Sequence, residues 1–400
     1  KDIPEAVRRP LELRHEAGKA SVAKINALLH GLSDDGRARG MMQFHAASTG
    51  RWAGRRFQPQ NIKRPELDAK GVDGAIDVIL NNPPAKAAAL LDILYGPPLS
   101  VVGDCLRGMI CAPPDRKLIA ADFSNIEGRV LAWLAGESWK VEAFRAYDRG
   151  VGPDLYLVTA AEILGVDVKT LNKKSPERQA YGKVPELACG YQGGVGAFQT
   201  MAHTYRITIE DELAQRIVKA WRAKHPNVTQ FWWDLEEAAF EAVINPGSVT
   251  TVRDVKFKVV GSFLWCQLPS GRSLCYPYPA IAWKDMPWTD DAGKPVRKQV
   301  VSYRGVNSYT RKWETIYTYG GKLAENITQA VARDVLADAI VRIEAAGYQV
   351  VMHVHDEVIC EVPDDFGSVE EFEALMVELP PWAAGLPVAA EAWSGERYRK

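Results

Sequence analysis

The sequence predicts an α+β protein, because its helical and strand-like segments fall into separate runs. Residues 66–110 and 175–245 carry mainly helical patterns, whereas residues 249–280 and 296–319 alternate and turn as strands do. A doubly wound sheet would instead alternate strands with helices along the whole chain. A chain of 400 residues is long enough for two or three subdomains around a large core.

The first 64 residues combine a helix with an irregular basic segment. Apolar side chains at helical spacing predict a helix over residues 5–30, which Gly31 ends. Residues 41–64 are rich in Arg, Gln, Gly and Asn without periodicity, which is typical of irregular backbone that carries functional side chains. This stretch of the chain holds 13 Lys and Arg against 6 Asp and Glu, while the whole chain has a net charge of −1. The excess would suit a polyanion, but composition alone favours a charged surface helix.

Apolar runs and breaker residues predict the remaining elements. Lys117–Phe123 is a buried strand, and a helix follows it from Ser124 to about Gly136. The other expected elements are helices over 66–110 (broken at 81–84 and 96–98), 154–164 and 175–245 (broken at 193–194 and 225–226), strands within 249–280 and 296–319, a helix over 322–346, and strands over 348–354 and 358–362.

Composition excludes several classes of protein. The 12 Trp, 14 Tyr and 11 Phe exclude a disordered chain, and no apolar run reaches the ~18 residues of a membrane helix. The start of the sequence does not resemble a secretion signal, and its first residue is Lys rather than Met, so we expect a fragment or a processed product. The six cysteines form no CxxC pair, which predicts reduced thiols in a cytoplasmic protein and no structural zinc site.

The first candidate site is the segment Asp122–Arg129, where an apolar strand delivers a carboxylate at its end. Asp122 would be held rigidly at a sheet edge, where a metal ion could bind. Ser124 and Glu127 also match a capping box at the start of the following helix. Spacing alone favours this purely structural interpretation.

The second candidate is the hairpin around His355-Asp356-Glu357. A polar β-turn is the simplest interpretation of such residues. The flanking strands are very apolar, however, and belong in a core. If the two strands that end at Asp122 and Asp356 pair, their carboxylates could hold two divalent ions for phosphoryl transfer.

The third candidate is the helical segment Arg178–Tyr191. Lys183, Leu187 and Tyr191 lie four residues apart, so one helix face presents a cation, an apolar side chain and an aromatic ring. This face suits a nucleoside triphosphate, with the cation on phosphate and the ring against the base. Pro185 would kink or break the helix, and an ordinary amphipathic helix with a solvated lysine remains the alternative.

The fourth candidate is the basic stretch from Ser48 to Arg64. Its cations could contact phosphates, and the alternative is a basic surface loop. The cations are Arg51, Arg55, Arg56, Lys63 and Arg64.

In this order, the four segments resemble the motifs of family A DNA polymerases. Asp122–Arg129 resembles motif A, Arg178–Tyr191 is similar to motif B, and His355-Asp356-Glu357 matches motif C. The remaining matches are Thr49-Gly50-Arg51 with the T-G-R of the thumb–palm junction, Gln60-Asn61-Ile62 with its Q-N-I, and Leu268–Pro277 with a palm strand that contains Gly-Arg. The resemblance runs from about residue 40 to 362 and is closest to the phage and prophage branch.

The resemblance implies a right-hand polymerase fold with an antiparallel-sheet palm, helical fingers and a partial helical thumb. The implied divisions are the end of the thumb (1–40), the thumb–palm junction (41–64), a first palm segment (65–165, with an insertion at 66–105), the fingers (166–260) and a second palm segment (261–400, with an insertion at 281–318).

The resemblance also implies a template-directed DNA polymerase that uses two Mg²⁺ ions, with Mn²⁺ as a substitute. Asp122 and Asp356 would be the metal ligands, together with the carbonyl of Phe123, and Glu357 would support them. Lys183 would bind the triphosphate of the incoming dNTP and protonate pyrophosphate. Primer–template DNA would be the partner, in the cytoplasm of a bacterium or a phage-infected cell, and a 3′–5′ exonuclease domain would lie upstream of Lys1.

The family pattern assigns further residues to the nucleotide and the DNA. Tyr191 would close over the nascent base pair, and Glu127 would exclude a ribose 2′-hydroxyl while accepting the hydroxyl of Tyr191 and leaving Ser124 to cap the helix. Arg51 and Gln329 would donate to minor-groove acceptors that every base pair presents. The other implied DNA contacts are Asn61, Arg272 and His355 at the primer end.

The sequence departs from the family pattern at several positions. Leu187 stands where the family has Phe or Tyr, and Gln192 stands where it has Gly. Gln179 occupies the place of a family Arg, and Arg178 lies one residue earlier, which on an α-helix turns it about 140° away from Lys183. An irregular start to the helix, helped by Pro185, would return Arg178 to the phosphates.

Three rival functions remain open from the sequence. A single-subunit RNA polymerase would share the architecture, but Glu127 argues against room for a 2′-hydroxyl. A non-catalytic duplex-binding module is disfavoured by the intact carboxylates. A two-metal nuclease would need a separate acidic cluster, which the sequence does not show.

Overall fold

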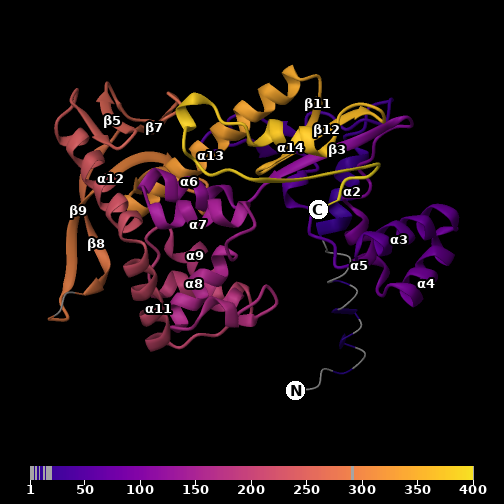
Figure 1. Ribbon diagram of the computed structural model, residues 1–400, viewed down its shortest axis with the longest axis horizontal. Helices are drawn as coiled ribbons and strands as arrows, with labels where there is room; N and C mark the ends of the chain where they lie inside the picture. The colour runs from indigo at the N-terminus through magenta and orange to yellow at the C-terminus, as the bar shows by residue number, and fades with distance from the viewer. Residues whose placement is uncertain are drawn as a thin grey trace.

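The computed structural model describes residues 20–289 and 292–399, together with 4, 7, 8, 10, 11 and 14. Its helices are α2 (Ala20–Leu29), α3 (Ala69–Asn81), α4 (Pro84–Leu94), α5 (Pro98–Cys105), α6 (Ile126–Ala135), α7 (Ser138–Asp148), α8 (Leu155–Leu164), α9 (Val184–Cys189), α10 (Val195–Thr204), α11 (Asp211–Lys224), α12 (Pro226–Ile244), α13 (Gly320–Ala345) and α14 (Val369–Val377). Its strands are β1 (Met42–Gln43), β2 (Ala53–Gly54), β3 (Arg116–Phe123), β4 (Val249–Val252), β5 (Val255–Val260), β6 (Phe263–Gln267), β7 (Ser273–Pro277), β8 (Ala280–Thr289), β9 (Pro295–Val306), β10 (Trp313–Tyr317), β11 (Gln349–Val354), β12 (Glu357–Pro363) and β13 (Ala390–Gly395). These elements confirm the predicted separation of helical and strand runs (Figure 1).

A four-stranded antiparallel sheet in the order β11-β12-β3-β13 positions the candidate carboxylates. The middle of β3, Leu118–Ala121, is apolar and buried because both faces of the sheet are covered. Ile119 and Ala121 face the main core, which includes α13, whereas Leu118 and Ala120 pack on the other face with Tyr398. Figure 1 shows α13 and α14 lying against this sheet.

A group of helices, α7 to α12, lies beside the sheet and carries the third candidate segment (Figure 1). Trp221 of α11 and Trp232 of α12 are almost fully buried and stack with ring centroids 6.1 Å apart. The helices pack through these rings into the same core as β3, so the group is joined to the sheet by one continuous hydrophobic interior.

Two further antiparallel sheets follow the helical group. One has the order β4-β5-β6-β7 and the other the order β10-β9-β8. The expected boundary between residues 260 and 261 falls in the turn between β5 and β6, which pair directly. The hydrogen bonds of the sheet β4–β7 therefore cross the expected boundary.

The segment expected as an insertion at 66–105 contains the helices α3, α4 and α5, which enclose a small core of their own. Its buried residues are Ala75, Ile76, Leu91, Val101 and Cys105. Among the described residues, no single helix has the length and apolar character needed to cross a membrane, and only α4 and α5 taken together, bent by 93°, meet that test. All six cysteines are described and are free thiols.

Candidate functional site

The strand register brings the two predicted carboxylates together. Asp122 at the end of β3 lies directly opposite Glu357 at the start of β12, and the amide of Phe123 donates to the carbonyl of Asp356 at 3.1 Å. Asp356, in the turn just before β12, therefore lies at the same edge of the sheet as Asp122. His355 has a positive φ of 57°, which allows the tight turn that places Asp356 at the edge of the sheet.

Glu357 is held inside the protein rather than at its surface. The residue is 1% exposed, and the hydroxyl of Tyr398 donates to its Oε2 at 2.6 Å. Arg107 contacts the same hydroxyl at 3.5 Å. Burial and the neighbouring carboxylate raise the pKa of Tyr398 far above its usual value, so it remains a hydrogen-bond donor at neutral pH. This arrangement gives Glu357 a supporting position.

The donor set fits a magnesium ion that shares its ligands with substrate and water. Within the described residues, no three His, Cys, Asp or Glu side chains form a group that could hold a metal by themselves. Mg²⁺ is commonly bound through one or two carboxylates plus substrate phosphates and waters, rather than by a complete protein cage. Asp122 and Asp356 would provide the two carboxylates of such a site.

A short polar chain links the junction segment, α6 and the end of α9. Arg51 Nη2 donates to Glu127 Oε1 at 2.5 Å, and the hydroxyl of Tyr191 donates to Glu127 Oε2 at 3.2 Å. The Tyr191–Glu127 contact is the one expected from the sequence. Burial first, and then the charge of Glu127, raise the pKa of Tyr191 well above its usual value, so the hydroxyl keeps its proton.

The capping box predicted at the start of α6 does not form. The N-cap residue is Asn125, which has a positive φ of 50°, and no side chain caps the helix. Instead, the carbonyl of Ser124 accepts from Arg129 Nε at 2.6 Å. Glu127 therefore has no capping role, and its carboxylate accepts hydrogen bonds from Arg51 and Tyr191.

The helix that carries Lys183 begins with a π-helical turn over Arg178–Lys183. Pro185 follows immediately, in the first turn of α9. Proline has no amide hydrogen, so Pro185 cannot donate an ordinary i→i+4 hydrogen bond there. The amide of Val184 bonds the carbonyl of Gln179, five residues back, as in a π-helix. In an i→i+5 turn, residues five apart lie on the same side of the helix, so Arg178 and Lys183 share one side.

The outward face of α9 matches the prediction. Leu187 is 41% exposed, and Lys183 and Tyr191 are partly exposed, while Val184, Pro185 and Ala188 are buried. Lys183 Nζ lies 5.2 Å from the centroid of the Tyr205 ring. Arg178, by contrast, is held by Asp154, with contacts of 3.1 and 2.8 Å, and its guanidinium lies over Tyr156. Gln179 lies among Pro176, Tyr181 and Tyr205 at a separate hollow.

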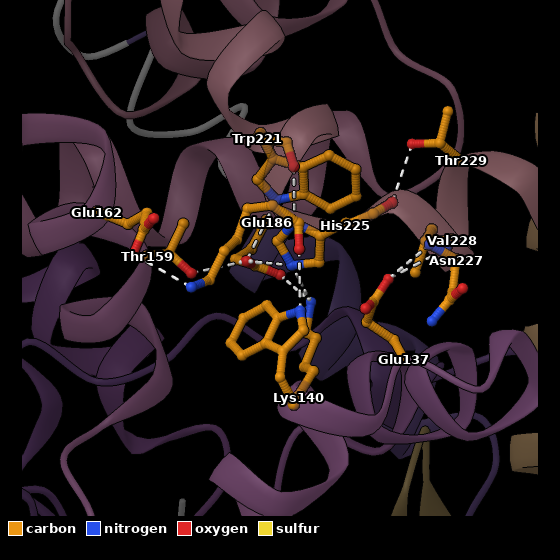
Figure 2. A network of polar contacts seen from close by, with 12 residues as sticks. Glu137, Lys140, Thr159, Glu162, Glu186, Trp221, His225, Asn227, Val228 and Thr229 are labelled. Atoms are coloured by element: carbon orange, nitrogen blue, oxygen red, sulfur yellow. Dashed lines mark hydrogen bonds and ion pairs between the residues drawn. The ribbon is translucent and has the colours of Figure 1, made fainter.

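A buried polar network fixes the inward side of α9 (Figure 2). Glu186 accepts from Lys140 of α7, from Thr159 Oγ1 of α8 at 2.8 Å and from Trp221 Nε1 of α11 at 3.2 Å. Lys140 and Glu186 have side chains only 2% and 7% exposed. Burial alone would raise the pKa of Glu186, but the ammonium of Lys140 outweighs it, so the pKa lies below its usual range and the pair is ionised.

The same network joins α11 to α12. Nδ1 of His225, at 0% exposure, lies 2.8 Å from the Trp221 carbonyl, and its Nε2 lies 3.3 Å from Lys140 Nζ. Glu137 accepts from the amides of Asn227 and Val228 at 3.0 and 3.2 Å, where α12 begins (Figure 2). A carboxylate at this helix N-terminus satisfies donors that have no partner within the helix. Four helices are therefore tied to the one that presents Lys183.

A cleft of about 340 Å³ opens between the junction segment, α13 and the turn that carries Asp356. Arg51, Asn61, His355 and Asp356 line it, as their predicted roles require. The His355 ring lies 3.2 Å from the Gln60 carbonyl, and Asn61 donates to the Gln58 side chain at 2.8 Å.

Sequence reasoning missed three residues of this cleft, Trp52, Arg333 and His353. The guanidinium of Arg333 lies 4.3 Å from the Trp52 ring centroid, and the His353 ring meets the same ring edge-on at 4.6 Å. Burial and Arg333 lower the pKa of His353 to about 4, so this ring is neutral at pH 7. The available signals were spacings: Arg333 lies one helical turn after Gln329, and His353 lies two residues before His355.

Arg272, which the family pattern predicts as a DNA contact, forms several hydrogen bonds within the protein. Arg272 Nε donates to Asp334 at 2.6 Å, and its Nη2 donates to the carbonyls of Thr49 and Ala330, both at 3.0 Å. These contacts tie the turn after β6 to α13 and to the junction segment, so Arg272 supports the fold. Gln329 lies on α13, partly exposed, one turn before the cleft-lining Ala332 and Arg333.

Comparisons with known proteins give a consistent result. A family profile described as DNA polymerase family A matches residues 11–256, which include Asp122 and Lys183 but not Asp356. A DNA polymerase of Bacillus phage SP02 is 38% identical over 397 residues, which cover 99% of this chain and 58% of the phage protein. DNA polymerase I of Pseudomonas aeruginosa is 31% identical over 129 residues, 32% of this chain and 13% of that protein.

A solved structure shares the fold. The POL domain of Pol1 from M. smegmatis, in complex with DNA primer-template and dNTP, matches with a TM-score of 0.60 and 18% identity. The match covers 96% of this chain and 52% of that chain. This chain thus spans about 58% of the length of the phage relative and about half of the structural one.

Proposed function

The chain belongs to DNA polymerase family A, and from this premise we propose that it is a template-directed DNA polymerase module that adds dNTPs to a primer 3′-hydroxyl and releases pyrophosphate. One observation carries the proposal: β3 pairs with β12 so that Asp122 lies opposite Glu357, and the amide of Phe123 donates to the carbonyl of Asp356. Two carboxylates at this separation in sequence have no structural need to meet at a sheet edge.

Asp122 and Asp356, with the Phe123 carbonyl, are the residues that would hold the two Mg²⁺ ions of this proposal. Bound there, the metals would lower the pKa of the primer hydroxyl and neutralise charge on the triphosphate. Glu357, which accepts from the hydroxyl of Tyr398, would add negative charge near the two ligands. Mn²⁺ offers similar oxygen-ligand chemistry and would substitute.

The outward face of α9 would receive the dNTP. Lys183 would place its ammonium on the triphosphate and donate a proton to the leaving pyrophosphate. Leu187 would offer an apolar surface to the sugar, and Tyr191 would lie against the nascent base pair. Gln179 would reach the triphosphate only after a movement of the helix, and Arg178 only after release from Asp154.

The cleft beside α13 would receive the end of the primer–template duplex. Arg51, Asn61 and Gln329 would donate to minor-groove acceptors, which are common to all base pairs and therefore carry no sequence preference. His355 would contact the primer end. We place the palm in the sheet β11-β12-β3-β13, the fingers in α7 to α12 and the end of the thumb in the segment before residue 41. Such a module would work in the cytoplasm of a bacterium or a phage-infected cell.

Primer extension with all four dNTPs and Mg²⁺ on a defined primer–template tests the proposal directly. We expect template-directed products that depend on each complementary dNTP. Products only with NTPs would favour the RNA polymerase alternative. Binding of the duplex without extension would identify a non-catalytic module, and primer shortening without dNTPs would identify a nuclease.

Changing Glu127 to Ala is expected to weaken the preference for dNTPs over NTPs by about tenfold to a hundredfold. The side chain is fixed between Arg51 and Tyr191, in the position where it would exclude a 2′-hydroxyl. Single-nucleotide incorporation gives kcat/KM for matched dNTP and NTP substrates. Glu142→Ala, at an exposed carboxylate of α7 that pairs with Arg145, is the control, and an unchanged ratio in Glu127→Ala would refute the sugar-selecting role.

A further inference from the structure

The sheet β10-β9-β8 stands apart from the candidate site, at the edge of the molecule beside α12 (Figure 1). It corresponds to the segment that the sequence marks as an insertion, and none of its residues lines the cleft beside Asp356. The function proposed above does not use it. Its side chains, however, are unusually rich in exposed aromatic rings and cations.

The strand register sorts these side chains onto two faces. Directly opposite residues share a face, so the pairs Lys284↔Lys298, Arg304↔Thr315 and Ser302↔Tyr317 lie on one side. Trp313, two residues before Thr315, lies there as well. We call this side the basic–aromatic face, and it comprises Lys284, Lys298, Arg304, Trp313 and Tyr317.

Cations and rings alternate across the basic–aromatic face. Lys284 Nζ lies 5.2 Å from the centroid of the Tyr317 ring, and Lys298 Nζ lies 5.9 Å from that of Trp233 on the adjoining α12. Trp313 is 52% exposed, Tyr317 is 40% exposed and Trp233 is 49% exposed. Large rings left this open in water, two of them beside a lysine, are suited to a ligand that offers both flat apolar surfaces and negative charge.

The opposite face of the same sheet has a different character. There, Arg297 pairs with Asp285 at 3.4 Å and lies over Trp283, so its charge is offset within the sheet. On the basic–aromatic face, Lys298 pairs with Glu236 of α12 at 2.7 Å, but Lys284 and Arg304 form no ion pair with any described residue. The positive charge is therefore confined to one side.

The basic–aromatic face is close in sequence to the start of α13, which packs against Tyr191. After Tyr317, the chain passes through Tyr319, which is 43% exposed, into α13. The amide of Gly321 donates to Gln192 Oε1 at 2.9 Å, and a Cβ atom on Gly321 would collide with the carbonyl of Tyr191. The start of α13, three residues after Tyr317, is thus anchored against the residue that would cover the nascent base pair.

We propose that the basic–aromatic face binds the single-stranded stretch of the template that has not yet been copied. Unpaired bases expose their flat faces and stack on aromatic side chains, while lysine and arginine attract the phosphates. In a duplex the base faces are covered by stacking, so aromatic side chains could not stack on them. This inference rests on the proposed function, because the polymerase supplies both the single strand and its position beside Tyr191.

The test compares binding to primer–templates that share one duplex and differ in the template overhang. By fluorescence anisotropy, without dNTPs, we expect a 5′ overhang of about 12 nucleotides to bind about tenfold more tightly than one of about 2 nucleotides. The double variant Trp313→Ala/Tyr317→Ala should lose this preference and keep the affinity for the short overhang. Lys284→Gln should reduce the salt dependence for the long overhang by about 0.7 in the log–log slope.

Trp283→Ala is the matched control, because it removes an equally exposed tryptophan from the other face of the same sheet. The proposal is overturned if the parent protein shows no overhang preference, if the double variant retains it, or if Trp283→Ala loses it equally. Equal affinity for a long overhang and for a downstream duplex of the same length would also overturn it. Because binding is measured without synthesis, a protein that fails to extend primers yet shows the preference would disprove only the proposed function.

Discussion

Replacement of Asp356 by Ala is expected to reduce primer extension by about a thousandfold or more, while the affinity for primer–template changes by no more than about threefold. The residue would supply one of the two carboxylates that the register of β3 and β12 brings together. Losing Asp356 would leave the metal site with one of its two carboxylates. Binding should persist, since removal of a negative charge does not weaken the attraction of DNA.

Two measurements make this expectation specific. Single-turnover extension at saturating dNTP separates the chemical step from binding, and anisotropy with the same primer–template reports affinity. Asp365→Ala is the control, because Asp365 is an exposed acid in the turn that follows the other end of β12. Extension by Asp356→Ala within about tenfold of the parent rate would contradict the assignment of the metal ligands.

The sequence predicted the features of the site that depend on local pattern. An apolar strand ending in Asp122 and an apolar hairpin around Asp356 are each visible in short windows, and their pairing followed from one assumption that the register confirms. The face of α9 was also predictable, since i, i+4 spacing fixes which side chains share a side. These features could be predicted from the sequence without knowledge of tertiary contacts.

The features that could not be predicted from the sequence depend on contacts between residues far apart in the chain. The capping box at Ser124 and Glu127 was wrong because Asn125 takes a left-handed conformation and α6 begins one residue later than expected. The π-helical turn at Arg178–Lys183 was suggested only loosely by Pro185, and the salt bridge of Arg178 to Asp154 was not suggested at all. Because Arg178 and Asp154 lie 24 residues apart, no periodic pattern in the sequence indicates that they pair.

The buried Lys140–Glu186 ion pair also could not be predicted from the sequence. Its loss should have a large effect on stability. We expect Lys140→Met to lower the free energy of unfolding by about 3–5 kcal/mol, because it leaves the carboxylate of Glu186 buried without its counter-charge. Urea denaturation followed by tryptophan fluorescence measures this, since Trp221 lies within the network. KM for dNTP should also rise, because α9 loses its main tie to α7.

The double variant Lys140→Met/Glu186→Leu separates stability from positioning. Removing both charges and filling the space with apolar side chains often restores stability, so the free energy of unfolding should recover to within about 1–2 kcal/mol of the parent value. Thr159 and Trp221 would still lose the oxygen to which they donate, so α9 would keep its packing but not its fixed rotation. We therefore expect KM for dNTP to stay raised in the double variant while kcat changes little. If KM returned to the parent value together with stability, the network would serve only the fold, and the position of Lys183 would depend on packing alone.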